Sequence, residues 1–382
     1  MSPVIRSTHA GTPGFAGTVR NVSRIAAVAT ALPSHAYPQQ AITDLLAPIV
    51  AHDPRKQALM RRMHASSRVA TRHLVLPLEE YRDALTFGQT NDRFVEEGTR
   101  LAESAVRRAL AEAGVRPDEV DLIVFTSVTG LSAPSVDALL VPRLGMREDV
   151  KRMPMFGLGC VAGASGIARV HDYLEGHPED VALLVSVELC SLTVQKDDDS
   201  VDNLVASGLF GDGAAAVVLV GAARAAGVHG PDVVATRSRL YPGSGSVIGF
   251  RPSETGFRVI LTAGVVDVID ANFAADATAF LTDHGLGVPD VATWIAHPGG
   301  PKVLDAFQRG LDLPAGALDR SWASMAAVGN LSSSSVLHVL ADELRAPHDD
   351  HQMGLLFALG PGVSAELVLL RWPEAAEALA AA

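Results

Sequence analysis

Two segments of the chain, one near the middle and one near the end, repeat the same pattern. Residues 210–221 read FGDGAAAVVLVG and residues 359–370 read LGPGVSAELVLL, so that each places a Gly-x-Gly turn directly before an apolar strand. One such turn is common in proteins, but two that close a matched order of helices and strands indicate an internal duplication. We therefore expect two similar halves, residues 23–222 and 223–382, preceded by a flexible tail over residues 1–22.

Helical and strand patterns alternate within each half. Apolar residues recur at helical spacing up to Ala113, and Gly114 follows as a helix stop. Continuous apolar runs, each expected as a buried strand, occupy residues 120–127, 181–189, 291–297 and 353–359. Buried strands that alternate with helices are typical of an α/β fold with largely parallel sheets. With 48% hydrophobic residues, a chain of 382 residues can bury an extensive core.

Charge and hydropathy narrow the classes of function. A net charge of -12 disfavours a general nucleic-acid-binding surface. One basic cluster exists, and it is either a solvated face or a mouth that attracts anions: Arg55, Lys56, Arg61, Arg62, Arg68 and Arg72. No apolar run reaches the roughly 18 residues that a membrane span requires, so we expect no membrane span and a cytoplasmic protein. The two cysteines do not have metal-binding spacing.

One of these cysteines lies in a segment built mainly of glycine and alanine. Cys160 stands in FGLGCVAGASG, residues 156–166, between an extended run and a helical run of small residues. A free cysteine is most often a small buried core residue. Small neighbours, however, permit a sharp strand-to-helix turn that presents the thiol, and a helix N-terminus lowers the pKa of a thiol. The pattern therefore favours Cys160 as a nucleophile.

Two polar residues of the second half can complete a site around Cys160. His297 ends an apolar strand before PGG, and Asn330 follows a glycine at the start of a helical segment. Taken alone, His297 is a structural histidine at a strand end and Asn330 is a helix N-cap. Together they supply a histidine partner for a thiolate and two neutral donors for an oxyanion. A site between the halves would suit decarboxylative Claisen condensation, in which the thiolate accepts an acyl group and a malonyl unit loses carbon dioxide.

The motifs together resemble a known family. FGLGCVAGA, GLFGDGAAAVV, IAHPGGPKVLDAF, VGNLSSSSV and LGPGVSAE follow the order and spacing of type III polyketide synthases, the chalcone/stilbene synthase group of the thiolase superfamily. The resemblance runs from about Ser23 to Trp372. It implies an α/β, thiolase-like αβαβα fold of two duplicated halves, an acyl-bearing Cys160, and decarboxylation by His297 and Asn330. It also implies a homodimer that uses CoA thioesters as substrates, without a metal or another cofactor.

The resemblance further implies a set of substrate-binding residues. Phe210 and Phe257 match two gatekeeper phenylalanines between the CoA tunnel and the cavity, and Arg62 matches one basic residue of the CoA phosphate site. The remaining residues expected to bind substrate or shape the cavity wall are Thr129, Cys190, Thr193, Val259 and Gly362.

The product is predicted from the cavity wall and from two further segments. A wall of Val128, Cys190, Val259 and Leu261 would be apolar and would suit an aliphatic starter. ATRHLVLPLEEY and VELCSLTVQKDDDS are similar to segments of actinobacterial alkylpyrone-forming enzymes of the germicidin synthase kind. We therefore expect an aliphatic acyl-CoA or acyl-ACP starter, malonyl-type CoA extenders and release of an alkyl 4-hydroxy-2-pyrone.

Three other functions remain as alternatives. The first is an aromatic-forming bacterial synthase of the tetrahydroxynaphthalene or dihydroxyphenylacetate type, which uses malonyl-CoA alone. The second is a ketoacyl-ACP synthase III-like enzyme that condenses once, and HPGG in place of that group's usual His-Gln-Ala-Asn motif disfavours it. The third is a thiolase-fold binding protein without activity, which the intact set of Cys160, His297 and Asn330 disfavours.

Overall fold

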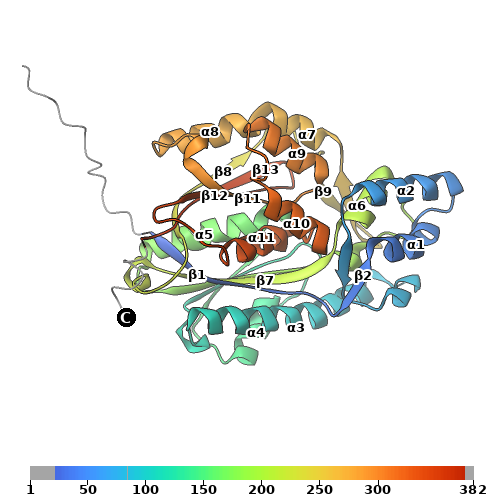
Figure 1. The fold of residues 1–382 in the computed structure, drawn as a ribbon. Coiled ribbons are helices and arrows are strands. Elements are labelled where there is room, and N and C mark those ends of the chain that lie inside the picture. The colour runs from blue at the N-terminus through green and yellow to red at the C-terminus, as the bar shows by residue number, and fades with distance from the viewer. Residues whose placement is uncertain (1–21, 84, 375–382) are drawn as a thin grey trace, which may run out of the picture.

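The central element of the structure is one nine-stranded sheet. The computed structural model describes residues 22–83 and 85–374, so the predicted tail lies outside the described residues except for residue 22 (Figure 1). The strand order is β11-β12-β13-β8-β1-β7-β6-β4-β5. The first limb of the sheet consists of β1 (Ser23–Ala31), β4 (Leu122–Thr126), β5 (Lys151–Met155), β6 (Val181–Leu189) and β7 (Asp212–Val220). The second limb consists of β8 (Asp232–Leu240), β11 (Val291–Ala296), β12 (Met353–Gly360) and β13 (Ser364–Arg371).

The two limbs repeat one topology, which confirms the duplication. Each begins with a strand that pairs with the strand after its Gly-x-Gly turn, β1 with β7 and β8 with β13. That strand next pairs with β6 or β12, which in turn pairs with β4 or β11. The limbs meet where β1 pairs with β8 over two residue pairs.

The prediction of largely parallel sheets is wrong. Within the large sheet, β4 pairs in parallel with β5 and β6, and β11 with β12, but β7 and β13 run antiparallel to both of their neighbours. A continuous apolar run shows that both faces of a strand are covered, and it says nothing about strand direction. Here helices cover both faces of a mixed sheet.

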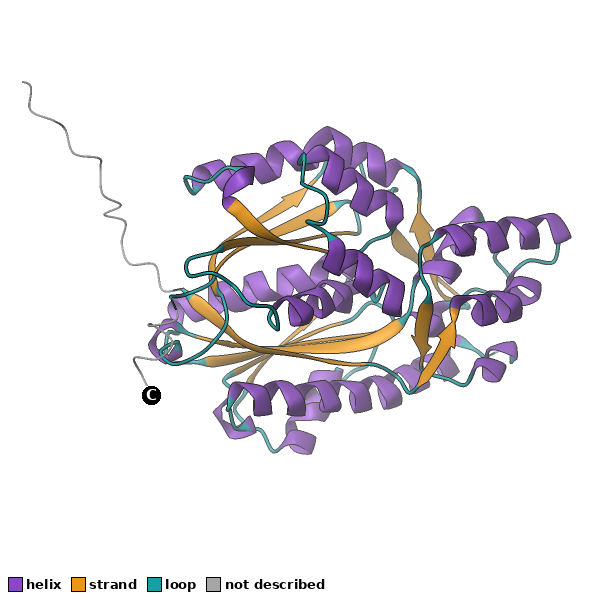
Figure 2. Cartoon of the chain, in the orientation of Figure 1, coloured by secondary structure: helices purple, strands orange, loops and turns teal. Residues whose placement is uncertain are grey.

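Helices and the two limbs form five layers, α, β, α, β and α (Figures 1 and 2). The helices α5 (Ala162–Gly176) and α11 (Ser335–Glu343) lie between the limbs and share one apolar core with strands of both. The outer layer on the first limb contains α3 (Phe87–Ala113) and α4 (Val136–Leu144). The outer layer on the second limb contains α7 (Gly264–Val268), a π-helical turn (Ile269–Phe273), α8 (Ala274–Asp283) and α9 (Pro301–Gly310).

The remaining elements gather at one end of the layers, on the right of Figure 1. They are α1 (Gln39–Val50), α2 (Pro54–Ser66), α6 (Val201–Leu209), α10 (Asp319–Val328) and two small sheets, β2 (His35–Pro38) with β3 (Thr71–Leu74) and β9 (Ile248–Ser253) with β10 (Gly256–Leu261). Short 3-10 turns complete the chain at Leu78–Arg82, Pro117–Glu119, Gly159–Val161, Cys190–Thr193, Ala222–Arg224, Val288–Asp290 and Ser332–Ser334. Among the described residues no helix is long and apolar enough to cross a bilayer.

The two halves of the chain approach closely in the middle layer. A Cβ atom on Gly163, in the first turn of α5, would lie only 2.3 Å from the backbone oxygen of Ser333, in the turn before α11. A hydrogen atom is therefore the largest side chain that this contact admits. The small residues that follow Cys160 allow the two central helices to approach.

We expect Gly163→Ala to lower the free energy of unfolding by about 1–3 kcal/mol, because the methyl group must push the two helices apart. Gly176→Ala is the matched control, since it lies at the other end of α5 and its Cβ would meet no atom within 4 Å. Urea unfolding of both variants measures the difference. Equal stability of the two variants would contradict the close contact.

Candidate active site

Cys160 lies in a tight turn that leads into α5. The 3-10 turn Gly159–Val161 directly precedes the helix. Gly159 has a φ of +56°, and a Cβ there would lie 2.5 Å from Pro361 Cδ, so only glycine fits this position. Pro361 belongs to the turn between β12 and β13, which therefore supports the turn at Cys160. The Cys160 thiol donates to Ser332 Oγ over 3.6 Å.

His297 and Asn330 lie at the ends of two elements of the second half. His297 directly follows β11, and its side chain is only 2% exposed. Neither ring nitrogen has a hydrogen-bond partner among the described residues. Asn330 follows α10 after Gly329, and its Nδ2 donates to Gly299 O over 3.4 Å. The Asn330 Oδ1 accepts from the Ser332 backbone N–H over 2.8 Å, so the side chain caps this turn and also presents a donor.

Short contacts join these three residues in one region. Ser332 contacts both Cys160 and Asn330. Gly299 accepts from Asn330, and its own N–H donates to the His297 backbone oxygen over 2.8 Å. Ser332 has a φ of +49°, a conformation that is rare for a residue other than glycine and is found where surrounding contacts hold a site in place. The structure thus connects Cys160 of the first half to Asn330 of the second through Ser332, and Asn330 to the backbone beside His297 through Gly299.

Burial controls the charge of the site without ligand. It raises the pKa of Cys160 to about 12, partly offset by the hydrogen bond to Ser332, with the Glu188 carboxylate raising it further. Burial also lowers the pKa of His297 to about 3. The helix N-terminus was expected to lower the pKa of the Cys160 thiol, but the loss of solvent around the buried thiol raises that pKa by more. The Cys160 thiol and the His297 imidazole, each taken alone, are neutral at pH 7. Transfer of the thiol proton to the imidazole charges both groups at once, so that each ion has an oppositely charged partner.

We expect His297→Gln to shift the pH profile of Cys160 alkylation to higher pH, because the variant removes an imidazole that can accept the thiol proton as a cation. The alkylation rate follows the thiolate and rises with pH below the thiol pKa. Iodoacetamide labelling of Cys160, followed by peptide mass spectrometry from pH 5 to 10, measures the shift. Identical profiles for both proteins would show that the imidazole does not stabilise the thiolate.

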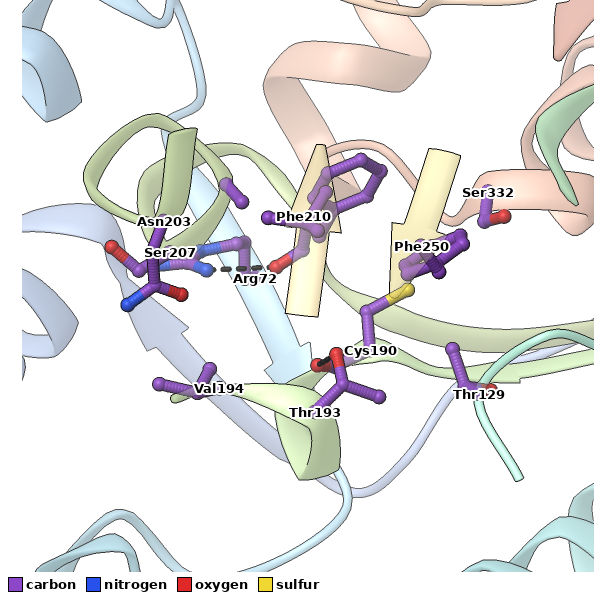
Figure 3. A pocket seen from close by; sticks show the side chains of 12 residues that line it. Arg72, Thr129, Cys190, Thr193, Val194, Asn203, Ser207, Phe210, Phe250 and Ser332 are labelled. Atoms are coloured by element: carbon purple, nitrogen blue, oxygen red, sulfur yellow. Dashed lines mark hydrogen bonds between the residues drawn. The ribbon is translucent and has the colours of Figure 1, made fainter. Parts of the chain in front are cut away.

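A cavity opens at Ser332, the residue that contacts Cys160 and Asn330, and Figure 3 shows its walls. Cys160, His297 and Asn330 are not themselves part of its wall. Five of the predicted residues line it: Phe210, Thr129, Cys190, Thr193 and Val259. The other lining residues are Arg72, Val194, Asn203, Ala206, Ser207, Phe250 and Ser332. Its free volume is about 30 Å³, which holds one or two water molecules. A polyketide chain therefore requires side chains along this wall to move.

The walls of this cavity are more polar than predicted. Of the four residues expected to form an apolar wall, Cys190 and Val259 line the cavity, whereas Val128 and Leu261 do not. Polar side chains of Arg72, Thr129, Thr193, Asn203, Ser207 and Ser332 line it as well. The expectation of an apolar wall failed because the lining residues come from segments far apart in the sequence. The sequence alone does not show which of these segments fold around the same cavity.

The three other predicted binding residues lie outside the cavity wall. Phe257 is 6% exposed and packs with Phe87 and Phe250, its ring centroids 5.3 and 6.5 Å from theirs. Gly362 has a φ of +69° and donates to Ile248 O over 2.9 Å, which ties the β12–β13 turn to β9. Arg62 is exposed on α2. Their roles in substrate binding stay predictions.

The sequence motifs did not single out Ser332, Phe250 or Arg72 as site residues. Ser332 lies two positions after Asn330, so its proximity was available from the motif VGNLSSSSV. Phe250 pairs across two strands with Val259, and recognising that hairpin would have placed both side chains on one face. Arg72 was grouped with exposed basic residues, but it is 2% exposed.

Residues 16–224 match the family "Chalcone and stilbene synthases, N-terminal domain", and residues 232–373 match the C-terminal domain of the same family. The chain belongs to the chalcone and stilbene synthase family. It is a type III polyketide synthase, a Cys-His-Asn condensing acyltransferase with the thiolase-like fold, and enzymes of this type use CoA thioesters.

The names of similar proteins point to two kinds of product, tetrahydroxynaphthalene and an alpha-pyrone. A 1,3,6,8-tetrahydroxynaphthalene synthase from Streptomyces peucetius is 53% identical over 350 residues, 91% of this chain and 93% of that protein. The crystal structure of a tetrahydroxynaphthalene synthase from Streptomyces coelicolor, at 31% identity, covers 92% of this chain and all of that chain with a TM-score of 0.86. An alpha-pyrone synthesis polyketide synthase-like protein from Mycobacterium tuberculosis is 31% identical over 359 residues, 91% of each chain. These similarities favour the aromatic-forming alternative over the predicted alkylpyrone synthase.

Proposed function

We propose that this synthase condenses malonyl-CoA alone, as starter and extender, and forms 1,3,6,8-tetrahydroxynaphthalene. The observation that carries the proposal is the 53% identity to a synthase of that product over 91% of the chain. The polar cavity wall supports it, because a chain with a carbonyl at every second carbon offers many hydrogen-bond acceptors.

The first step loads the starter. The Cys160 thiolate attacks the thioester carbonyl, the bond from that carbonyl to the CoA sulfur breaks, and the CoA thiolate takes up a proton. His297 is the group placed to hold the proton that leaves Cys160. The turn around Gly159 is fixed by its contact with Pro361, so loading of Cys160 costs little rearrangement of the backbone.

The second step extends the chain. A malonyl-CoA extender loses carbon dioxide, and its thioester oxygen develops negative charge as the enolate forms. The His297 ring and the Asn330 Nδ2 are the donors for this oxygen, and both are buried, which strengthens such bonds. The enolate carbon then attacks the acyl group on Cys160, the acyl–sulfur bond breaks, and the extended chain leaves on CoA for reloading.

Repetition and ring closure complete the product. The ten ring carbons of tetrahydroxynaphthalene correspond to five two-carbon units, so five malonyl-CoA give one product, five carbon dioxide, five CoA and one water. The four extenders release four carbon dioxide, and the carboxylate of the starter leaves as the fifth. An aldol condensation closes one ring with loss of water. A Claisen condensation closes the other ring and releases the last thioester.

The test is incubation of the purified protein with malonyl-CoA alone and then with added acyl-CoA starters. Tetrahydroxynaphthalene from malonyl-CoA alone, identified by mass spectrometry against a standard, is the expected product. Pyrones whose mass follows the alkyl starter, with no aromatic product from malonyl-CoA alone, would overturn the proposal in favour of the alkylpyrone function.

We also propose that the synthase is a homodimer in the cytoplasm. The terminal strand β5 has one unpaired edge, and exposed apolar side chains lie beside it: Leu131, Met153 and Phe156, the last 56% exposed. An unpaired edge with apolar neighbours favours pairing with another chain. Analytical ultracentrifugation of the protein and of Phe156→Glu tests this, since the charged variant should shift the mass toward one chain.

A further inference from the structure

A buried arginine of the cavity has an unused donor group. Arg72 in β3 is 2% exposed. Its Nε donates to Gln39 Oε1 over 2.9 Å, and its Nη1 donates to the Phe210 backbone oxygen over 2.7 Å, as the dashed line in Figure 3 shows. Its Nη2 is buried and has no hydrogen-bond partner among the described residues. A buried cationic donor without a partner costs free energy, so such a group usually has a ligand.

The surrounding charges do not neutralise Arg72 directly. Burial lowers its pKa to about 10, with Asp212 opposing that change, so it remains a cation at pH 7. Asp212 itself accepts from the Val75 N–H and from the Ser191 N–H, each over 2.7 Å, and makes no ion pair with Arg72. The guanidinium therefore keeps capacity for one more anionic oxygen.

Arg72 is also joined to the catalytic region. A Cβ on Gly329, the residue before Asn330, would lie 3.2 Å from Arg72 Cγ, so the arginine stem packs on this backbone. Phe210, whose carbonyl accepts from Arg72, forms a bridge with Asn330. Arg72 and Ser332, the hydrogen-bond partner of Cys160, line the same cavity.

We propose that Arg72 Nη2 binds the free carboxylate of a malonyl-derived starter, and that this contact makes the synthase select a dicarboxylic starter over neutral acyl groups. The inference rests on the proposed function and adds a residue that determines starter choice. A malonyl unit on Cys160 keeps its distal carboxylate, and a chain grown from it carries that carboxylate deeper into the cavity. A guanidinium–carboxylate contact is a charge-assisted hydrogen bond, about twice as strong as a neutral one.

The first test compares two acyl donors that differ in this group. Acetoacetyl-CoA has the size of malonyl-CoA, with a methyl ketone in place of the carboxylate. In a His297→Gln background, which slows decarboxylation, both are offered to the full-length protein and the Cys160 adducts are read by intact mass. The ratio of the two adducts cancels any effect of the substitution on the thiol itself. We expect malonyl to load about 10–100-fold faster, and equal loading would overturn the proposal without the need for an Arg72 variant.

The second test changes Arg72 in the same background. Arg72→Met should abolish the preference, and Arg72→Lys should keep part of it through its charge. Arg100→Gln, an exposed arginine that pairs with Glu97 on α3, is the control and should keep the preference. Circular dichroism establishes that each variant is folded. A folded Arg72→Met that still prefers malonyl would show that only water occupies the space at Nη2, and the proposal would be wrong.

The two proposals can fail separately. If the unaltered synthase makes no tetrahydroxynaphthalene but its malonyl preference disappears in Arg72→Met, the proposed product is wrong and the carboxylate site stands. If it makes tetrahydroxynaphthalene and Arg72→Met keeps the preference, the product stands and the carboxylate site is wrong. In the otherwise unaltered enzyme, Arg72→Met should also shift mixed incubations with hexanoyl-CoA toward alkylpyrones.

Discussion

Replacement of Cys160 by alanine is expected to abolish both acyl loading and polyketide formation. The sulfur is the only nucleophile at the turn before α5, where the thiol contacts Ser332 beside Asn330. Loss of a nucleophile on which the covalent intermediate depends removes nearly all activity. Intact-mass measurement after incubation with malonyl-CoA should show no adduct, and product analysis should show no polyketide.

Two companion variants separate the thiol from the rest of the site. Cys190→Ala should still form the adduct, because Cys190 lies in a different turn, Cys190–Thr193, and not in the strand-to-helix turn at Gly159. Cys160→Gln should still decarboxylate malonyl-CoA, because His297 and Asn330 remain. An adduct on Cys160→Ala protein would show that another residue is the nucleophile.

The second large effect is expected for the donors of the oxyanion site. Asn330→Ala should keep acyl loading, and His297→Gln should load only at higher pH. Each should lose about 10²–10³-fold in malonyl-CoA decarboxylation, because each removes one donor to the developing enolate oxygen. The Asn330 change should be the larger in its structural effect, since Oδ1 also holds the Ser332 turn. Carbon dioxide release from labelled malonyl-CoA and Cys160 acylation, measured on the same samples, separate the two steps.

The matched control for His297 is another buried histidine. His338 on α11 bonds to the Ala214 backbone oxygen over 3.2 Å, and burial lowers its pKa to about 4. His338→Gln should therefore lose stability and keep decarboxylation per folded molecule. Full-rate decarboxylation by a folded His297→Gln protein would remove His297 from the catalytic set.

The sequence predicted those features of the fold that have local causes. The apolar run at residues 181–189 corresponds to β6, and Gly114 ends α3 with a φ of +65°. Each is decided by neighbouring residues, through burial on both faces or through the conformational freedom of glycine. Strand direction depends on how distant segments dock, which explains why β7 and β13 were not predicted as antiparallel.

For the site, the sequence singled out the three catalytic residues but not the composition of the cavity wall. Cys160, His297 and Asn330 lie at the ends of regular elements, where side chains leave the layers, and the motif spacing indicated each of them. The composition of the wall was not predictable, because the burial of Arg72 arises from its packing beneath Phe210. One signal was available: Arg72 and Leu74 alternate in a short strand and so share its buried face.

The small sheet of β9 and β10 separates product choice from chemistry. It carries Phe250 and Val259 to the cavity, yet it belongs to neither limb of the large sheet and supplies none of the three catalytic residues. Its strands can diverge between homologues as long as Ile248 keeps its backbone bond to Gly362, because that bond ties β9 to the turn that supports Cys160. Exchange of this hairpin between related synthases would be a direct way to obtain new polyketides, because it changes the cavity wall and keeps the three catalytic residues.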